Sequence, residues 1–258
     1  MTELTPEHMA CWRQNGFVHL REVLSKPTCG DLRRWVEELE SWPESPGKWM
    51  KWFEGSNRQL CRVENFLQYH AGLAAFLQGH QIGTLLEQLM GEPAALFKEK
   101  VNYKLPGGAG FGAHQDAPAF ATFGHDYHIT LLVGIDVSTP QNGCLEIVHG
   151  HHDRALLPQN EGGEINADTV ASLPWIPVST EPRDIVFFDS YVPHRSQPNC
   201  SETSRRALYI TYNRRRDGYV RDQYFACKRE AFPPECERRE GVDYSTASNV
   251  YNLGNPIN

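Results

Sequence analysis

Two histidines and one aspartate have the residue types and the spacing of a metal site. His114 and Asp116 stand one residue apart in FGAHQDAPAF, and His194 follows the strand-like segment DIVFFDS. Residues i and i+2 of a strand point to the same face, so one short piece of backbone can present an imidazole and a carboxylate to one ion. Two histidines and a carboxylate leave positions open for a cosubstrate and O2, as in non-haem iron(II) oxygenases. The pattern therefore predicts a mononuclear iron(II) site.

The other histidines provide a competing interpretation. The chain has 11 histidines, so HxD pairs arise by chance, and a lone histidine before a loop is more often a surface residue than a ligand. The segment HGHHD, with His149, His151 and His152, could be taken for a metal-binding tract. Adjacent side chains diverge on a strand or a turn, so we expect this cluster to be a loop.

A carboxylate-binding group follows the last predicted ligand. Arg205 stands eleven residues after His194, at the start of RRALYITYN, a strand expected to pair beside the strand that carries His194. A guanidinium binds a carboxylate through two charge-assisted hydrogen bonds. Ser196 can donate to the same carboxylate. These residues predict a site for a cosubstrate that carries a carboxylate.

Polar residues alternate along one upstream strand. In FKEKVNYK the period of two sends Lys98, Lys100, Asn102 and Lys104 to one face. Lysines on an outer edge strand are ordinary, because they keep that edge from pairing with another chain. The functional alternative is a row that faces a site for a dianion. Spacing alone favours neither.

The hydrophobic period changes from helical to strand-like near residue 96. The expected elements are a helix over 5–15, a strand over 17–20, a helix from residue 26, a loop over 42–55, a helical region over 71–90 broken near Gly79 or Gly83, strands from 96 onward and a surface loop over 160–169. Strands without intervening helices indicate an antiparallel sandwich or barrel. The prediction is one domain over 1–258, with a helical N-terminal layer (1–95), a β core (96–215) and an irregular C-terminal tail (216–258).

Charge and cysteine content narrow the expected partners and location. The 258 residues include 25 basic and 32 acidic side chains, a net charge of −7, so neither nucleic acid nor an anionic membrane is an expected partner. The chain contains no run of about 18 apolar residues, and its first residues lack the pattern of a secretory signal. Seven cysteines without a CxxC pair indicate reduced thiols in a cytoplasmic protein. These patterns leave the oligomeric state open.

Four stretches together resemble the phytanoyl-CoA dioxygenase family of iron(II)- and 2-oxoglutarate-dependent oxygenases: KEKVNYKLPGGAGFGAHQD, DVSTPQNGCLEIVHGHH, RDIVFFDSYVPHRSQPN and SRRALYITYN. The resemblance implies a double-stranded β-helix, or jelly roll, with helices packed against it. It implies that His114, Asp116 and His194 bind iron(II), and that Arg205 with Ser196 binds the distal carboxylate of 2-oxoglutarate. The second substrate would be a small molecule, oxidised with O2.

A strand of the related ectoine hydroxylases is similar to KEKVNYK. This similarity implies that Asn102 and Lys104 help to hold 2-oxoglutarate, and that Lys98 or Lys100 reaches the cosubstrate or the substrate. The family's usual PGSH turn is HGHH here, and Arg195 stands where glycine is common. Neither departure touches the predicted ligands. Asp116 keeps the carboxylate that halogenases of this fold lack, which favours hydroxylation.

The segments RVENF, KEKVNYKLPGG, HQDAPAF and YNLGNPI are similar to those of hydroxylases of small aminophosphonates. This similarity implies an organophosphonate substrate, such as 2-aminoethylphosphonate or its N-trimethylated form, hydroxylated at C1 as the first step of its breakdown. Arg62 and Glu64 share a face if LCRVENF is extended, and we expect them to contact this zwitterion. Trp49 and Trp52 could enclose an ammonium, although packing is the more common role of such residues.

Three other functions stay open at this point. The substrate could be another small metabolite or an acyl-CoA. The chain could be a non-catalytic metal-binding jelly roll, or a zinc hydrolase, which also uses two histidines and a carboxylate. The carboxylate-binding arginine favours the oxygenase, because a scaffold has no need for it.

Overall fold

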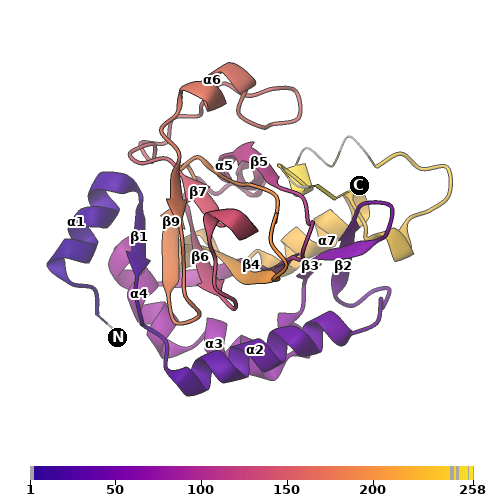
Figure 1. The fold of residues 1–258 in the computed structure, drawn as a ribbon, viewed down its shortest axis with the longest axis horizontal. Coiled ribbons are helices and arrows are strands. Elements are labelled where there is room, and N and C mark those ends of the chain that lie inside the picture. Colours follow the sequence, from indigo (N-terminus) through magenta and orange to yellow (C-terminus); the bar gives the residue numbers. More distant parts are fainter. Residues whose placement is uncertain (1–2, 245–246, 248–249, 255, 258) are drawn as a thin grey trace.

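Two antiparallel sheets form the core of the computed structural model, which describes residues 3–244, 247, 250–254, 256 and 257 (Figure 1). The larger sheet has the order β1-β9-β6-β11-β4-β3-β2, and the smaller one β5-β10-β7-β8. One apolar cluster contains residues of both sheets, among them Leu132 and Phe188 of the larger sheet and Leu145 and Ile147 of the smaller. The sheets therefore pack face to face, as the jelly-roll prediction requires.

The strands are β1 Phe17–Leu20, β2 Met50–Glu54, β3 Gln59–Glu64, β4 Ala94–Lys104, β5 Phe111–His114, β6 His128–Gly134, β7 Leu145–Ile147, β8 Ile176–Val178, β9 Ile185–Asp189, β10 His194–Ser196 and β11 Arg205–Arg214. The α-helices are α1 Pro6–Asn15, α2 Lys26–Ser41, α3 Ala71–Leu77, α4 His80–Met90, α5 Ala117–Phe120, α6 Ala167–Ser172 and α7 Arg221–Ala231. In the part of the chain that the structure describes, none of the helices combines the length and apolar character needed to cross a membrane.

The N-terminal helices form where the sequence predicts them. The side chain of Thr5 caps α1 by accepting from the His8 amide, and Gly16 ends this helix in the left-handed conformation. Helix α2 buries the stripe Leu32, Val36 and Leu39, packed in one cluster with residues of α3, α4 and the outer face of the larger sheet. The tyrosyl hydroxyl of Tyr103 on β4 donates to the Val36 carbonyl at 2.9 Å. The helical layer thus covers the face opposite the smaller sheet.

Three local predictions are wrong. The stretch 42–55 is not all loop, because Met50–Glu54 forms β2 and pairs with β3. Four of the five residues of β2 are buried, so the strand lacks the alternation of buried and exposed residues that would have predicted it. The tail contains helix α7, whose buried side chains include Lys228, a residue that no apolar pattern would place inside. The loop over 160–169 gives way to α6 at Ala167.

Candidate active site

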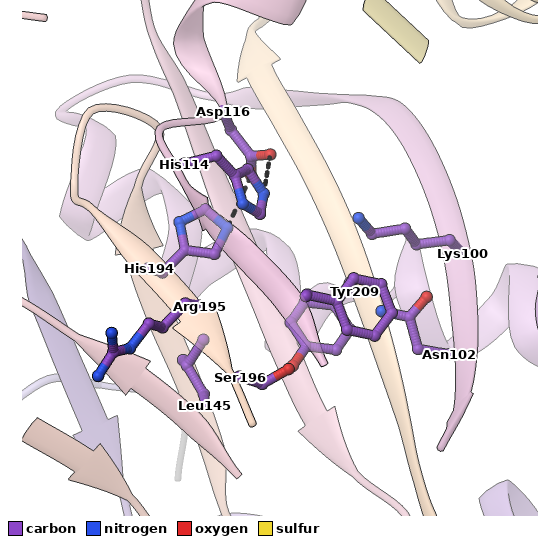
Figure 2. A pocket seen from close by; sticks show the side chains of 10 residues that line it. Lys100, Asn102, His114, Asp116, Leu145, His194, Arg195, Ser196 and Tyr209 are labelled. Atoms are coloured by element: carbon purple, nitrogen blue, oxygen red, sulfur yellow. Dashed lines mark ion pairs between the residues drawn. The ribbon is translucent and has the colours of Figure 1, made fainter. Parts of the chain in front are cut away.

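The three predicted metal ligands meet in the interior. His114 ends β5, His194 begins β10, and the two are directly opposed in the antiparallel pairing. The Asp116 carboxylate lies 3.8 Å from the Nε2 of His114 and 3.9 Å from the Nε2 of His194. Figure 2 shows the three side chains turned toward one another. Among the described residues they are the one group of histidine, cysteine and acidic side chains close enough to hold a metal.

Asp116 does not reach the site by strand alternation. Strand β5 ends at His114, and Asp116 has helical backbone angles (φ −71°, ψ −28°) just before α5. The prediction that strand alternation places His114 and Asp116 on one face is therefore wrong, although the two side chains do converge. The turn directs the Asp116 carboxylate toward the two imidazoles, and the hydroxyl of Thr130 donates to this carboxylate at 3.3 Å.

Backbone carbonyls fix the orientation of both imidazoles. The Nδ1 of His114 lies 2.7 Å from the Gly112 carbonyl, and the Nδ1 of His194 lies 3.1 Å from the Val192 carbonyl. A carbonyl only accepts, so each Nδ1 must carry the proton and each Nε2 keeps its lone pair. Metal-binding histidines are held in this way by their other nitrogen. The donor set therefore fits a divalent transition-metal ion.

The protonation states also suit a cation. Burial, with the neighbouring His194, lowers the pKa of His114 to about 3, and burial lowers the pKa of His194 as well. Burial opposes ionisation of Asp116, but His194 and the nearby lysines hold its pKa well below the usual range. At neutral pH the site therefore offers two neutral imidazoles and one carboxylate.

The second histidine cluster serves another purpose. His149 lies 3.1 Å from the Asn15 side chain through its Nδ1, and the Nε2 of His152 lies 3.1 Å from the Arg13 carbonyl. These contacts tie the loop after β7 to α1. The expectation that HGHHD is a loop is confirmed.

Lys104 contacts Ser196, which lines the cavity, and Arg205 is the partner of Lys104 in the pairing of β4 with β11. The prediction that the strand of Arg205 pairs beside the strand of His194 is wrong. Strands β11 and β10 belong to different sheets, so their side chains meet across the interior. The Lys104 ammonium donates to the Ser196 hydroxyl at 2.7 Å. Burial, with the charge of Arg205, lowers the pKa of Lys104 to about 7. Arg205 is 2% exposed and its Nε has no hydrogen-bond partner among the described residues, which suits an incoming carboxylate.

The polar row of β4 faces the interior. Strand β4 pairs with β11 on one side and β3 on the other, so the interpretation as a solvated edge is wrong. Lys100 and Asn102 line the cavity of the metal triad, together with Phe111, Leu145, Arg195, Ser196 and Tyr209. In Figure 2 the Lys100 ammonium faces the triad, whereas the Arg195 guanidinium points away. Burial lowers the pKa of the Lys98 ammonium, and the nearby charge of Asp116 partly offsets this lowering.

Arg62 and Glu64 share this inner face, as predicted. The Nε of Arg62 donates to the Asn102 side chain at 3.1 Å, and its Nη1 lies 3.2 Å from the Glu64 carboxylate. Lys228 of α7 lies 2.5 Å from the other oxygen of that carboxylate. Burial alone would raise the pKa of Glu64, but Lys228 and Arg62 lower it to about 2.

The two tryptophans do not form a cage. Trp49 packs against Trp42 at 4.2 Å and Tyr69 at 5.4 Å between ring centroids, in contact with the helical layer. Trp52 is 2% exposed and stacks on Phe232. Both roles are packing, the more common one for such residues.

Two residues near the site escape the sequence analysis. Tyr209 lines the cavity, and its hydroxyl lies 3.4 Å from Arg205. Strand parity from Arg205 could have found it, since residues 205 and 209 share a face. Lys228 lies more than 160 positions from Glu64 in the chain, and no local signal joins them.

Known proteins of similar sequence and fold include several oxygenases. The family model described as phytanoyl-CoA dioxygenase (PhyH) matches residues 12–207. The chain is 52% identical to 2-aminoethylphosphonate dioxygenase of the uncultured bacterium HF130_AEPn_1 over the full length of both. It is 43% identical to methylphosphonate hydroxylase of Gimesia maris, over 90% of this chain and 89% of that one. The structure of EctD from S. alaskensis with bound Fe shares the fold, with a TM-score of 0.72 at 16% identity over 84% of this chain and 79% of that one.

His114→Ala should weaken Fe(II) and Co(II) binding by more than about 100-fold, because even outer partners of a ligand contribute 10–100-fold to affinity. Anaerobic titration of the metal-free protein measures the effect. His151→Ala, in the HGHHD loop, is the control and should bind like the wild type. Equal affinities of H114A and wild type would exclude His114 as a ligand.

Proposed function

The chain belongs to the phytanoyl-CoA dioxygenase (PhyH) family of iron(II)- and 2-oxoglutarate-dependent oxygenases, and on this premise we propose that it hydroxylates C1 of 2-aminoethylphosphonate. It is an enzyme of this class rather than a metal-binding scaffold or a zinc hydrolase. The observation that carries the substrate proposal is a pair of lysines beside the metal triad. Among the described residues, neither the Lys98 nor the Lys100 ammonium has a hydrogen bond or an ion pair, and both are largely buried.

These lysines suit a doubly charged head group. Burial lowers the pKa of both, and for Lys100 the charges of Arg62 and Lys98 lower it further. A phosphonate that binds between them restores their charge and gains charge-assisted hydrogen bonds. One relative is a methylphosphonate hydroxylase, and the substrate in its name has no amine. This supports recognition of the substrate through its phosphonate group.

The residues of the chain divide the remaining work. His114, Asp116 and His194 hold the iron, and Arg205 with Ser196 receives the distal carboxylate of 2-oxoglutarate. When bound, iron(II) would supply the oxidising chemistry: 2-oxoglutarate would be converted to succinate and CO2, and of the two oxygen atoms of O2 one would enter succinate and the other the C–H bond of the substrate. The lysines orient the phosphonate so that its neighbouring carbon faces the triad. Asn102 and Lys104 close the cosubstrate end.

The amino end favours the unmethylated substrate. A quaternary ammonium is recognised by aromatic faces, but the nearby faces already carry the protein's own cations. The Lys98 ammonium lies 4.4 Å from the Phe120 ring centroid, and that of Lys228 lies 5.0 Å from Trp52. A primary ammonium can instead donate to a carboxylate, and Glu64 on β3 lies opposite Lys100, which lines the cavity. Arg62 and Lys228 hold Glu64 ionised for that contact.

Turnover tests the proposal directly. Iron-loaded enzyme should convert 2-oxoglutarate to succinate. For each succinate it should convert one 2-aminoethylphosphonate to 1-hydroxy-2-aminoethylphosphonate, which 31P NMR detects. Methylphosphonate, the N-trimethylated compound and an acyl-CoA serve as comparison substrates. Faster coupled turnover of any of these would replace the proposed substrate. Absence of succinate with every substrate, from enzyme that binds iron, would overturn the proposed activity.

Removal of Arg205 should act on the cosubstrate. Arg205→Ala should raise the KM for 2-oxoglutarate by about 10- to 100-fold, because a hydrogen bond to a charged group contributes about 1.5–3 kcal/mol. Arg206→Ala is the matched control, since the next side chain points to the outer face and pairs with Asp136. An unchanged KM in R205A would remove Arg205 from this role.

Removal of Lys100 should act on the substrate instead. Lys100→Met keeps the length of the side chain and should raise the KM for 2-aminoethylphosphonate by about tenfold or more, while the KM for 2-oxoglutarate stays within about threefold. The amount of succinate should also exceed the amount of hydroxylated product, because a poorly positioned substrate uncouples 2-oxoglutarate turnover from hydroxylation. Lys26→Met, an exposed lysine on α2, is the control. Equal effects on both KM values would place Lys100 at the cosubstrate.

A further inference from the structure

The described residues 251–254, 256 and 257 form a segment that lies against the strand of the first metal ligand (Figure 1). Leu253 is 7% exposed, and Ile257 is 6% exposed and bridges to Glu54 at the end of β2. The side-chain amide of Asn252 donates to the Ile257 carbonyl at 2.7 Å. The ring of Tyr251 meets Tyr224 of α7 edge-on, with 5.9 Å between centroids. These contacts anchor the segment on both sides of Gly254.

Gly254 connects this segment to the ligand His114. The Gly112 amide on β5 donates to the Gly254 carbonyl at 2.7 Å. The Gly112 carbonyl in turn accepts from the Nδ1 of His114 at 2.7 Å. The residue that orients the imidazole is therefore itself held by Gly254.

Only glycine fits this position. Its φ of +66° lies in the left-handed region, and a Cβ here would stand 2.7 Å from the Nδ1 of His114 and 2.8 Å from the Gly112 carbonyl oxygen. Both distances are well inside van der Waals contact. A side chain at this position must displace either the imidazole or the segment, and each displacement alters how His114 is held.

We propose that Gly254 is a positioning residue of the metal centre. It lies against the edge of the His114 imidazole and, through Gly112, fixes both the plane of the ring and the proton on Nδ1. The Nε2 lone pair is thereby aimed at the point where Asp116 and His194 converge. This inference rests on the metal site of the proposed function and adds to it a component from the far end of the chain.

Gly254→Ala tests the proposal, with Gly241→Ala as the matched control. Gly241 has a similar left-handed backbone (φ +76°) but no atom within 4 Å of a Cβ built there, so it carries the same backbone strain without the contact. Metal-free protein is titrated with Co(II), and the visible ligand-field bands are recorded. G254A should bind Co(II) about 10- to 100-fold more weakly, as outer partners of ligands do, with shifted bands. G241A should match the wild type in both.

Asn252→Ala provides a second route, should G254A fail to fold. It removes the hydrogen bond that closes the segment and adds no atom near His114, so Co(II) affinity should fall by roughly threefold or more, with a smaller band shift. Wild-type affinity and spectrum in a folded G254A would overturn the proposal, as would wild-type values in N252A if G254A does not fold. If the wild type itself binds no Co(II), the proposed metal site fails instead.

Discussion

The register between β5 and β10 is the constraint on which the site depends. His114 and His194 are directly opposed across this pairing, and their rings lie 4.2 Å apart between centroids. Side chains alternate along a strand, so a slip of one residue would turn one imidazole out of the interior. The pairing of β10 with β7 sets the same register from the other side, with His194 opposite Ile147. Strand pairing brings the two histidines together, and the turn after β5 adds Asp116.

A buried surplus of cations is the second constraint. Within the part of the chain that the structure describes, Lys98 and Lys100 form no ion pair, and the carboxylate of Glu64 is shared by Arg62 and Lys228. Unpaired buried charge is costly, and the lowered pKa values of both lysines express that cost. An anionic ligand would relieve this cost, so the same charges would favour binding of the proposed phosphonate.

The sequence predicted what depends on short-range periodicity. The helices before residue 42, the break at Gly79, the inward row on β4 and the identity of the metal triad all follow from spacing or from the resemblance. It failed where the geometry depends on distant partners. Asp116 converges through a turn beyond β5, and β10 and β11 lie in opposite sheets. Helix α7 escaped notice because its buried face includes Lys228, whose partner Glu64 belongs to β3. No local pattern contains such a pair.

Residues beyond the family match also contribute to the site. The family model ends at residue 207, and it includes every predicted iron ligand and Arg205. Tyr209, Lys228 and Gly254 lie beyond that limit, yet they line the cavity, hold Glu64 and support His114. The 2-aminoethylphosphonate relative matches through this region as well. Lys98, Lys100 and Glu64, the groups proposed to bind the substrate, lie within the family match. The last fifty residues therefore add to this part of the site and hold it in place, but they do not replace it.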